Sequence, residues 1–246
     1  MITKTIKSLA RSIGFDISRY RPDAHHGARY AHLLRTRGIQ QILDVGANAG
    51  QYGSLLRSNH DYRGRILSFE PLIEAHASLT ARAAADPLQR WSVARRAALG
   101  AMNGTTMIHV AGNSVSSSIL PMRPAHVAAA PQSVGQGMEE ITIRRLDDVV
   151  RERGVTIDRH VLLKIDTQGY ELEVLQGADE TVAAAGVIQT EMSFQPLYTG
   201  QPLFDEVYAY LADRGFTVFD IVPGFSDPHS GCLLQADGIF VRQGLS

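Results

Sequence analysis

A strand that runs into a glycine-bounded turn and then into a helix is the feature that most constrains this chain. Residues 42–52 have the sequence Ile-Leu-Asp-Val-Gly-Ala-Asn-Ala-Gly-Gln-Tyr, and residues 51–57 suit a helix. This pattern is typical of the first unit of a nucleotide-binding α/β fold. Gly46 and Gly50 let the turn pass close beneath a ligand, because glycine has no Cβ. The sequence therefore predicts a small-molecule site at this turn.

The chemistry of the turn favours one class of cofactor. A G-x-G-x-x-G fingerprint begun at Gly46 requires glycine at positions 48 and 51, where this chain has Asn48 and Gln51. Asp44 precedes the turn, where its charge disfavours a diphosphate and favours the sulfonium cation of S-adenosylmethionine (SAM). We therefore expect SAM, and an NAD-linked oxidoreductase is the rival from a different class.

A second predicted strand, residues 65–69, ends in Glu70 and Pro71. Glu70 lies at the sequence distance where such folds place a carboxylate on the ribose hydroxyls. Its two oxygens can accept hydrogen bonds from both hydroxyls. NAD and SAM share this ribose, so Glu70 predicts a nucleoside without choosing between them.

Length and composition fit one large α/β domain. The chain has 246 residues, of which 44% are hydrophobic, and its formal net charge is −1. This charge gives no reason to expect a nucleic-acid partner. The single cysteine, Cys232, excludes a disulfide within the chain and is compatible with the cytoplasm; we expect it to be buried. No apolar run approaches the ~20 residues of a membrane span, so we expect a soluble protein.

Residues 1–38 are predicted to form a basic amphipathic helical segment ahead of a domain at residues 39–246. Residues 1–37 carry eight Lys and Arg against two Asp, a net charge of +6. Apolar residues recur at helical spacing near the start of the chain, at Ile2, Ile6, Leu9 and Ile13. We expect this face to pack on the domain or on a sister subunit of a homodimer. The alternative is peripheral contact of residues 1–20 with an anionic membrane, on the inner membrane face.

The regular alternation of strand and helix is interrupted by an insertion at about residues 100–150. Strands are expected at residues 91–99, 105–110, 140–145, 161–166, 187–191, 216–222 and 239–241. Within the insertion, the serine-rich turn at residues 113–118, which includes Ser117, is expected beside the cofactor or the acceptor. Residues 121–137 are interpreted as a mobile lid.

Acidic residues end four of the predicted strands, namely Asp44, Glu70, Asp166 and Glu191. Ligands of open α/β sheets bind outside the carboxyl ends of the strands, so these side chains should converge on one edge. Asp166, Glu191 and His229 are the candidate catalytic bases. The alternatives are that Asp166 only fixes the cofactor, that Glu191 only caps or binds acceptor hydroxyls, and that His229 is an exposed loop residue.

No metal site is predicted. The sequence has no zinc-type ligand spacing. A Mg²⁺ ion held by Asp166 and Glu191 is the alternative that we consider and do not favour.

Four segments resemble the FkbM-type methyltransferases, in the same order along the chain: residues 44–52, 69–71, 163–178 and 235–241. The likeness runs from about residue 40 to the C-terminus and leaves the N-terminal segment outside. It implies a class I (Rossmann-like) SAM-dependent methyltransferase fold, with a seven-stranded, mostly parallel sheet covered by helices on both faces.

The resemblance also implies roles for individual positions. Gly46, Ala47, Asn48 and Gly50 would surround the methionine part of SAM, Glu70 would hold its ribose, and Asp166 would lie near the methyl donor. Further candidates for cofactor binding flank these positions, namely Asp44, Tyr52, Pro71 and Gln168, and Ser117 of the serine-rich turn is another.

The predicted activity is SAM-dependent transfer of a methyl group to a sugar hydroxyl. Rhamnose or fucose of a bacterial cell-envelope glycolipid is the specific prediction for the acceptor. A polyketide or other secondary-metabolite alcohol is the alternative within the class, and a non-catalytic SAM-fold protein is an alternative from a different class. Methyl transfer needs an aligned acceptor oxygen, and a weakly nucleophilic hydroxyl needs a positioned base.

Overall fold

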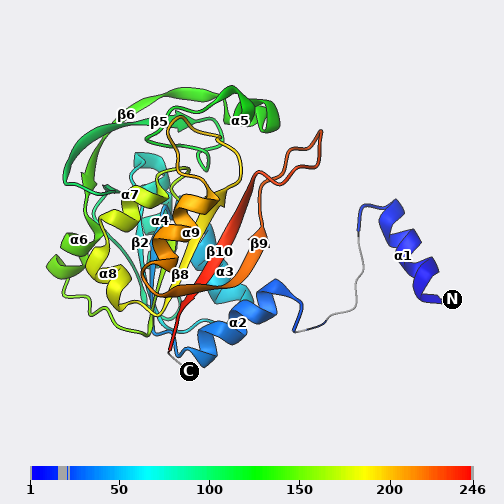
Figure 1. Ribbon diagram of the computed structural model, residues 1–246, viewed down its shortest axis with the longest axis horizontal. Helices are drawn as coiled ribbons and strands as arrows, with labels where there is room; N and C mark the ends of the chain where they lie inside the picture. The colour runs from blue at the N-terminus through cyan, green and yellow to red at the C-terminus, as the bar shows by residue number, and fades with distance from the viewer. Residues whose placement is uncertain (1, 16–20, 22, 245–246) are drawn as a thin grey trace.

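Seven strands form the central sheet of the computed structural model, which describes residues 2–15, 21 and 23–244 (Figure 1). The strand order is β3-β2-β1-β7-β8-β10-β9. The strands are β1 (Gln41–Val45), β2 (Arg65–Phe69), β3 (Trp91–Val93), β7 (Val161–Ile165), β8 (Val187–Ser193), β9 (Phe216–Pro223) and β10 (Gln235–Arg242). The first five in this order are parallel, and β10 runs antiparallel between β8 and β9. The sheet is thus mostly parallel, as predicted.

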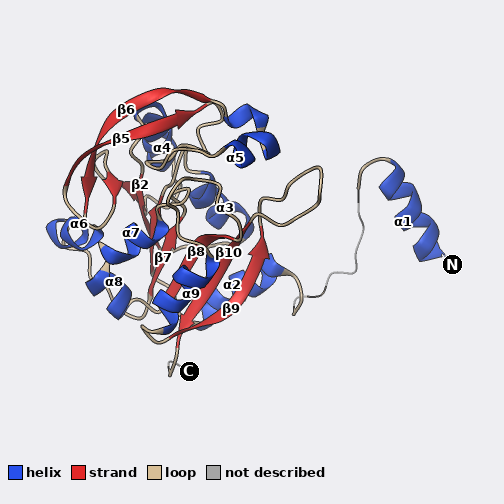
Figure 2. Ribbon diagram, turned by 45° about the horizontal axis from the view of Figure 1, so that its top comes forward, coloured by secondary structure: helices blue, strands red, loops and turns tan. Residues whose placement is uncertain are grey.

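Helices cover both faces of this sheet (Figure 2). One core cluster joins β1 and β2 to α2 (His26–Thr36), α3 (Gln51–Asn59) and α4 (Ile73–Ala84). The other core cluster includes α6 (Leu146–Glu152), α7 (Glu171–Gln176), α8 (Asp179–Ala184) and α9 (Phe204–Ala212). Strands covered on both faces become continuously apolar, which is why β7 reads Val-Leu-Leu-Lys-Ile and is buried throughout.

The N-terminal segment divides into two parts in the structure. Helix α2 belongs to the core, because Tyr30, Leu33 and Leu34 are buried against strand residues. Helix α1 (Ile2–Ser12) stands apart from the domain in both views (Figures 1 and 2). Of the two helices, only α2 packs on the domain.

The third predicted strand is wrong in its extent. Residues 91–99 split into β3 and β4 (Ala98–Leu99), because the chain leaves the central sheet at the exposed Arg95 and Arg96. β4 belongs to a second sheet with β5 (Gly104–Ala111) and β6 (Gly135–Arg144), in the order β4-β6-β5. In Figure 1 this sheet arches over the top of the molecule, on the side of the carboxyl ends of the parallel strands.

The insertion is more regular than its composition suggests. Between β5 and β6, residues 121–137 contain α5 (Pro124–Ala129) and a 3₁₀ turn at Pro131–Ser133. His126 of α5 is buried, with its ring 5.1 Å from that of Tyr198 and 5.5 Å from that of Phe225. The segment interpreted as a lid is therefore packed against the loops that follow β8 and β9.

Candidate active site

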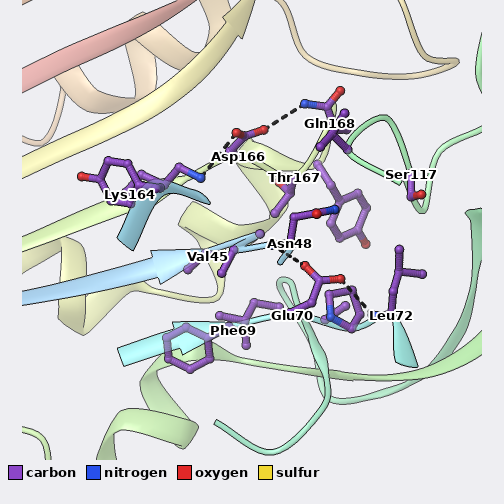
Figure 3. A pocket seen from close by; sticks show the side chains of 18 of the residues that line it. Val45, Asn48, Phe69, Glu70, Leu72, Ser117, Lys164, Asp166, Thr167 and Gln168 are labelled. Atoms are coloured by element: carbon purple, nitrogen blue, oxygen red, sulfur yellow. Dashed lines mark hydrogen bonds and ion pairs between the residues drawn. The ribbon is translucent and has the colours of Figure 1, made fainter. Parts of the chain in front are cut away.

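A cavity of about 440 Å³ lies at the carboxyl ends of β1, β2 and β7 (Figure 3). Its walls come from the two turns after β1 and β2, from the end of β7 and from the insertion. The volume lies in the range of small-molecule sites. Nine predicted cofactor residues line it: Gly46, Ala47, Asn48, Tyr52, Glu70, Pro71, Ser117, Asp166 and Gln168.

The turn after β1 forms one wall of the cavity and is fixed by its backbone. The amides of Gly46 and Ala47 donate to the carbonyl of Phe69, at 3.1 and 3.0 Å. Gly46 has φ +74°, and a Cβ at this position would lie 1.8 Å from the carbonyl oxygen of Asp166. Only glycine lets the turn approach the end of β7 this closely.

Glu70 is held by main-chain amides on both of its oxygens. The amide of Asn48 donates to Oε2 at 2.8 Å, and that of Leu72 donates to Oε1 at 2.9 Å. Burial raises the pKa of Glu70 to about 7. Each carboxylate oxygen can accept a further hydrogen bond, so Glu70 can still receive hydroxyl donors from the cavity.

An apolar wall faces the same part of the cavity. It is formed by Leu72 and by three residues of the second sheet, Ala98 and Leu99 of β4 and Ile108 of β5. A nucleoside has a planar base that packs on apolar side chains and ribose hydroxyls that pair with a carboxylate. The apolar wall and Glu70 together provide both.

Lys164 connects the acids beneath the cavity and was not predicted as a site residue. Its Nζ lies 3.5 Å from Oδ1 of Asp44 and 3.4 Å from Oδ2 of Asp166, and 5.3 Å from the ring centroid of Tyr52. Burial opposes the charge of Lys164, but Asp166, Asp44 and Asp237 together raise its pKa. The sequence could have indicated this role, because Lys164 is a charged residue inside an otherwise apolar strand.

The side-chain amide of Gln168 joins two predicted catalytic acids. Its Nε2 donates to Oδ1 of Asp166 at 2.9 Å and to Oε2 of Glu191 at 3.0 Å. Its Oε1 accepts the hydroxyl of Tyr198 at 3.0 Å. Gln168 has φ +56°, a left-handed conformation that turns its side chain back toward the strand ends. The side-chain amide of Gln168 thus bridges the two carboxylates.

Glu191 is an internal residue of β8 and does not line the cavity. Its Oε2 also accepts Nε2 of Gln235 at 2.6 Å. Burial and the neighbouring charge of Asp166 raise the pKa of Glu191 well above its usual value. Among the described residues, no group of three or more His, Cys, Asp and Glu side chains is arranged to hold a metal ion.

Two further predicted cofactor residues lie outside the cavity wall. Asp44 is fully buried below the turn, where Ser68 donates to it at 3.0 Å and Lys164 offsets its charge. Its pKa is raised by burial. Gly50 lies at the start of α3, where a Cβ would come within 3.1 Å of Leu79 and Trp91. Both residues support the turn from beneath.

His229 is not near the other candidate bases. It lies in the exposed loop between β9 and β10, where its amide donates to Asp227 Oδ1 at 2.9 Å. This loop projects from the edge of the sheet in Figure 1. Cys232 in the same loop is exposed, so the prediction that it is buried is wrong. His229 is therefore an exposed loop residue, which was the alternative to its role as a base.

Gln189 and Asp237 line the cavity and were missed. Oε1 of Gln189 accepts the hydroxyl of Tyr30 at 2.8 Å and that of Tyr52 at 3.2 Å. Burial, followed by the charge of Asp166, raises the pKa of Asp237 to about 6. Both residues are internal to their strands, so the strand-end argument could not find them.

The serine-rich turn of the insertion reaches the cavity, as predicted. Ser114, Val115 and Ser117 line it, and Nδ2 of Asn48 donates to Oγ of Ser114 at 3.2 Å. This contact joins the insertion to the turn after β1. Residues 121–137 contribute nothing to the lining.

The strand order, with one antiparallel strand near the edge, and a cavity at the carboxyl ends of β1, β2 and β7 define a class I methyltransferase. The family model described as the methyltransferase FkbM domain matches residues 44–218, and the chain therefore belongs to this family of SAM-dependent methyltransferases. The family and enzyme class predicted from the sequence are confirmed, and the NAD-linked alternative is set aside.

Two relatives support this assignment. Methyltransferase sdnD of Sordaria araneosa is 26% identical over 198 residues, which cover 72% of this chain and 73% of that protein. The 2-O-methyltransferase NoeI of Sinorhizobium fredii (strain NBRC 101917 / NGR234) is 31% identical over 169 residues, which cover 65% of this chain and 66% of that protein.

A solved structure shares the fold. The methyltransferase FkbM of Methylobacillus flagellatus KT matches with a TM-score of 0.50 at 13% identity. The match covers 81% of this chain and 43% of that chain, so this chain spans less than half of its length.

Proposed function

We propose that this protein transfers the methyl group of SAM to a hydroxyl oxygen of a glycosyl group. The observation that carries the proposal is the position of Asp166. Its carboxylate lines the cavity at the end of β7, its side chain is 36% exposed, and both of its oxygens have fixed partners. An accessible, oriented carboxylate beside a nucleoside cavity is what proton removal from an acceptor hydroxyl requires.

The residues of the cavity fit SAM. Glu70 offers its oxygens to the ribose hydroxyls, the wall of Leu72, Ala98 and Leu99 offers an apolar surface to the adenine, and the turn at residues 46–48 receives the methionine part. When bound, SAM supplies an electrophilic methyl group. The chain's contribution is to orient the acceptor, exclude water and take up the proton.

Asp166 is the better base of the two connected acids. Asp166 lines the cavity and is partly exposed, whereas Glu191 does not line the cavity, and burial raises its pKa. Gln168 fixes one oxygen of Asp166, and Lys164 stabilises the charge on the other. Asp166 thus accepts the hydroxyl proton, while Glu191, which is held by Gln235, fixes the amide of Gln168 that orients Asp166.

The acceptor is inferred from the chemistry of this edge of the site. Carboxylate and amide side chains from the end of β7 and from β8 and β10 line the cavity there, namely Asp166, Gln168, Gln189 and Asp237. Such groups pair with several hydroxyls of one sugar. The name of the relative NoeI supports oxygen as the accepting atom. Rhamnose or fucose of a cell-envelope glycolipid is the acceptor that we propose. Methylation of a polyketide alcohol in its place would overturn this choice of acceptor.

Calorimetry tests the cofactor first. S-adenosylhomocysteine should bind with micromolar affinity and NAD should not bind. The Glu70→Ala variant should lose about 1–3 kcal/mol of binding free energy through the missing ribose acceptor. Binding of NAD alone would overturn the cofactor assignment.

Transfer assays with deoxyhexosides and with polyketide alcohols then test the reaction. The Asp166→Asn variant should lower kcat by about 10²- to 10⁴-fold, with S-adenosylhomocysteine affinity unchanged within about threefold. Asp61→Asn, an exposed carboxylate paired with Arg63, is the matched control and should retain full activity. If Asp166→Asn kept the activity of the parent, Asp166 would not be the base.

A further inference from the structure

Helix α1 presents an uncovered apolar stripe. Along its length and just beyond it, Ile6 is 49% exposed, Leu9 69%, Ile13 69% and Phe15 67%. Ile6, Leu9 and Ile13 lie on one face, because they recur at intervals of three and four residues. Both ribbon views show α1 away from the helices and sheets of the domain (Figures 1 and 2).

The end of α1 is built to stop the helix and to extend this stripe. Gly14 has φ +84°, its amide donates to the carbonyl of Arg11 at 3.1 Å, and the amide of Phe15 donates to that of Ala10 at 2.9 Å. This pair of bonds is a Schellman cap, in which the residue after the glycine packs against the last turn. The cap places Phe15 beside Ala10, which is only 7% exposed. Helix α1 thus has its own C-terminal stop and needs no contact with the domain to end there.

The opposite face of α1 is cationic. It carries Lys4, Lys7 and Arg11, and residues 1–15 contain no Asp or Glu. A helix with apolar residues on one side and only cations on the other is suited to the interface of an anionic bilayer. Its lysine stems can reach along the helix to the phosphates while the apolar stripe enters the acyl region.

We propose that α1 docks this protein on a bilayer that contains anionic phospholipids. A second copy of the chain fits less well, because two helices that pair through their apolar stripes leave the cations of the opposite face outside the contact, whereas an anionic bilayer engages both faces. None of the helices that the structure describes is long and apolar enough to cross a membrane, so the contact is peripheral. The docking concerns α1 alone and does not depend on which acceptor the cavity takes.

Co-sedimentation of the protein with vesicles tests this proposal. Vesicles of phosphatidylcholine with phosphatidylglycerol should pellet the protein, and vesicles of phosphatidylcholine alone should pellet much less of it. Binding should weaken as salt is raised from 50 to 500 mM, because screening removes the attraction of exposed charges. Equal pelleting by both kinds of vesicle would contradict the role of the cations.

Two double variants separate the contribution of the cations to vesicle binding from that of the apolar stripe. Lys4→Gln with Lys7→Gln should weaken binding to the anionic vesicles about 25-fold, from about fivefold for each charge. Leu9→Ser with Ile13→Ser should weaken it by at least tenfold through lost apolar burial. The matched controls are Arg95→Gln with Arg153→Gln and Met102→Ser with Met138→Ser, which change exposed residues of the domain and should bind as the parent does.

Two further measurements make the outcome decisive. Thermal unfolding and S-adenosylhomocysteine binding should be the same in all variants, because α1 lies outside the core and the cavity. Sedimentation velocity without vesicles should show the same species for parent and α1 variants. A dimer that is lost in Leu9→Ser with Ile13→Ser, together with unchanged vesicle binding, would overturn the proposal and assign the stripe to a second copy.

Discussion

The two sides of the cavity hold their carboxylates in different ways. On the β1–β2 side, both oxygens of Glu70 are held by backbone amides, those of Asn48 and Leu72. On the β7–β8 side, Asp166 is held by the side chains of Lys164 and Gln168. Backbone amides are present whatever the neighbouring side chains are, whereas side-chain partners can be removed one at a time. The position of Glu70 thus depends on the path of the backbone, whereas the position of Asp166 depends on which side chains surround it.

Removing Lys164 should have the largest effect on stability. Lys164→Met leaves Asp44 buried beside Asp166 with no cation, and breaking a buried ion pair costs about 3–5 kcal/mol of the free energy of unfolding. Chemical denaturation measures this loss. Adding Asp44→Asn to Lys164→Met should restore part of it, because the uncompensated buried charge is then absent. A double variant no more stable than Lys164→Met would argue against the charge explanation.

The backbone of the β1–β2 side is tested by Gly46→Ala. The new Cβ would collide with the carbonyl oxygen of Asp166 and would also force a left-handed conformation on alanine. We expect a loss of about 2–4 kcal/mol in the free energy of unfolding. Gly154→Ala is the control, because φ there is +62° and nothing lies within 4 Å of the new Cβ. Equal losses in the two variants would show that conformation alone, without the close approach, decides the cost.

Glu70 gives the smallest expected effect, a dependence of cofactor affinity on pH. The raised pKa means that the carboxyl takes up a proton as the pH falls through about 7. The protonated form presents one acceptor fewer, so S-adenosylhomocysteine affinity should be constant above pH 8 and should fall below pH 7, by at most about tenfold per pH unit. Calorimetry between pH 5.5 and 8.5 measures it. In Glu70→Gln the affinity should be low and independent of pH over this range.

The same contrast explains which parts of the site could be predicted from the sequence. Gly46, Asn48 and Glu70 were found because a strand, a turn and the next strand are local patterns, and the backbone bonds between them follow from those patterns. Asp166 was found as a strand-end acid. Lys164 and Asp237 were missed because an internal strand residue shows nothing of its neighbours until the strands are paired.

The order of the strands decided which residues of β10 lie beside Glu191. β10 inserts antiparallel between β8 and β9, and its register places Asp237 opposite Glu191. Gln235 on the same strand thereby reaches Glu191, although the two are 44 positions apart. No periodicity in the sequence encodes that pairing.

The sequence by itself determined the parallel α/β architecture, the cofactor turn and the amphipathic character of α1. Each follows from contacts between residues close in the chain, through strand and helix periodicity, glycine conformations and charge spacing. Only the tertiary structure decided that α2 packs while α1 does not, that His229 lies away from the cavity, and that Gln168 joins Asp166 to Glu191. The physical reason is that side-chain hydrogen bonds and burial depend on strand order and register, which bring together residues from distant parts of the chain.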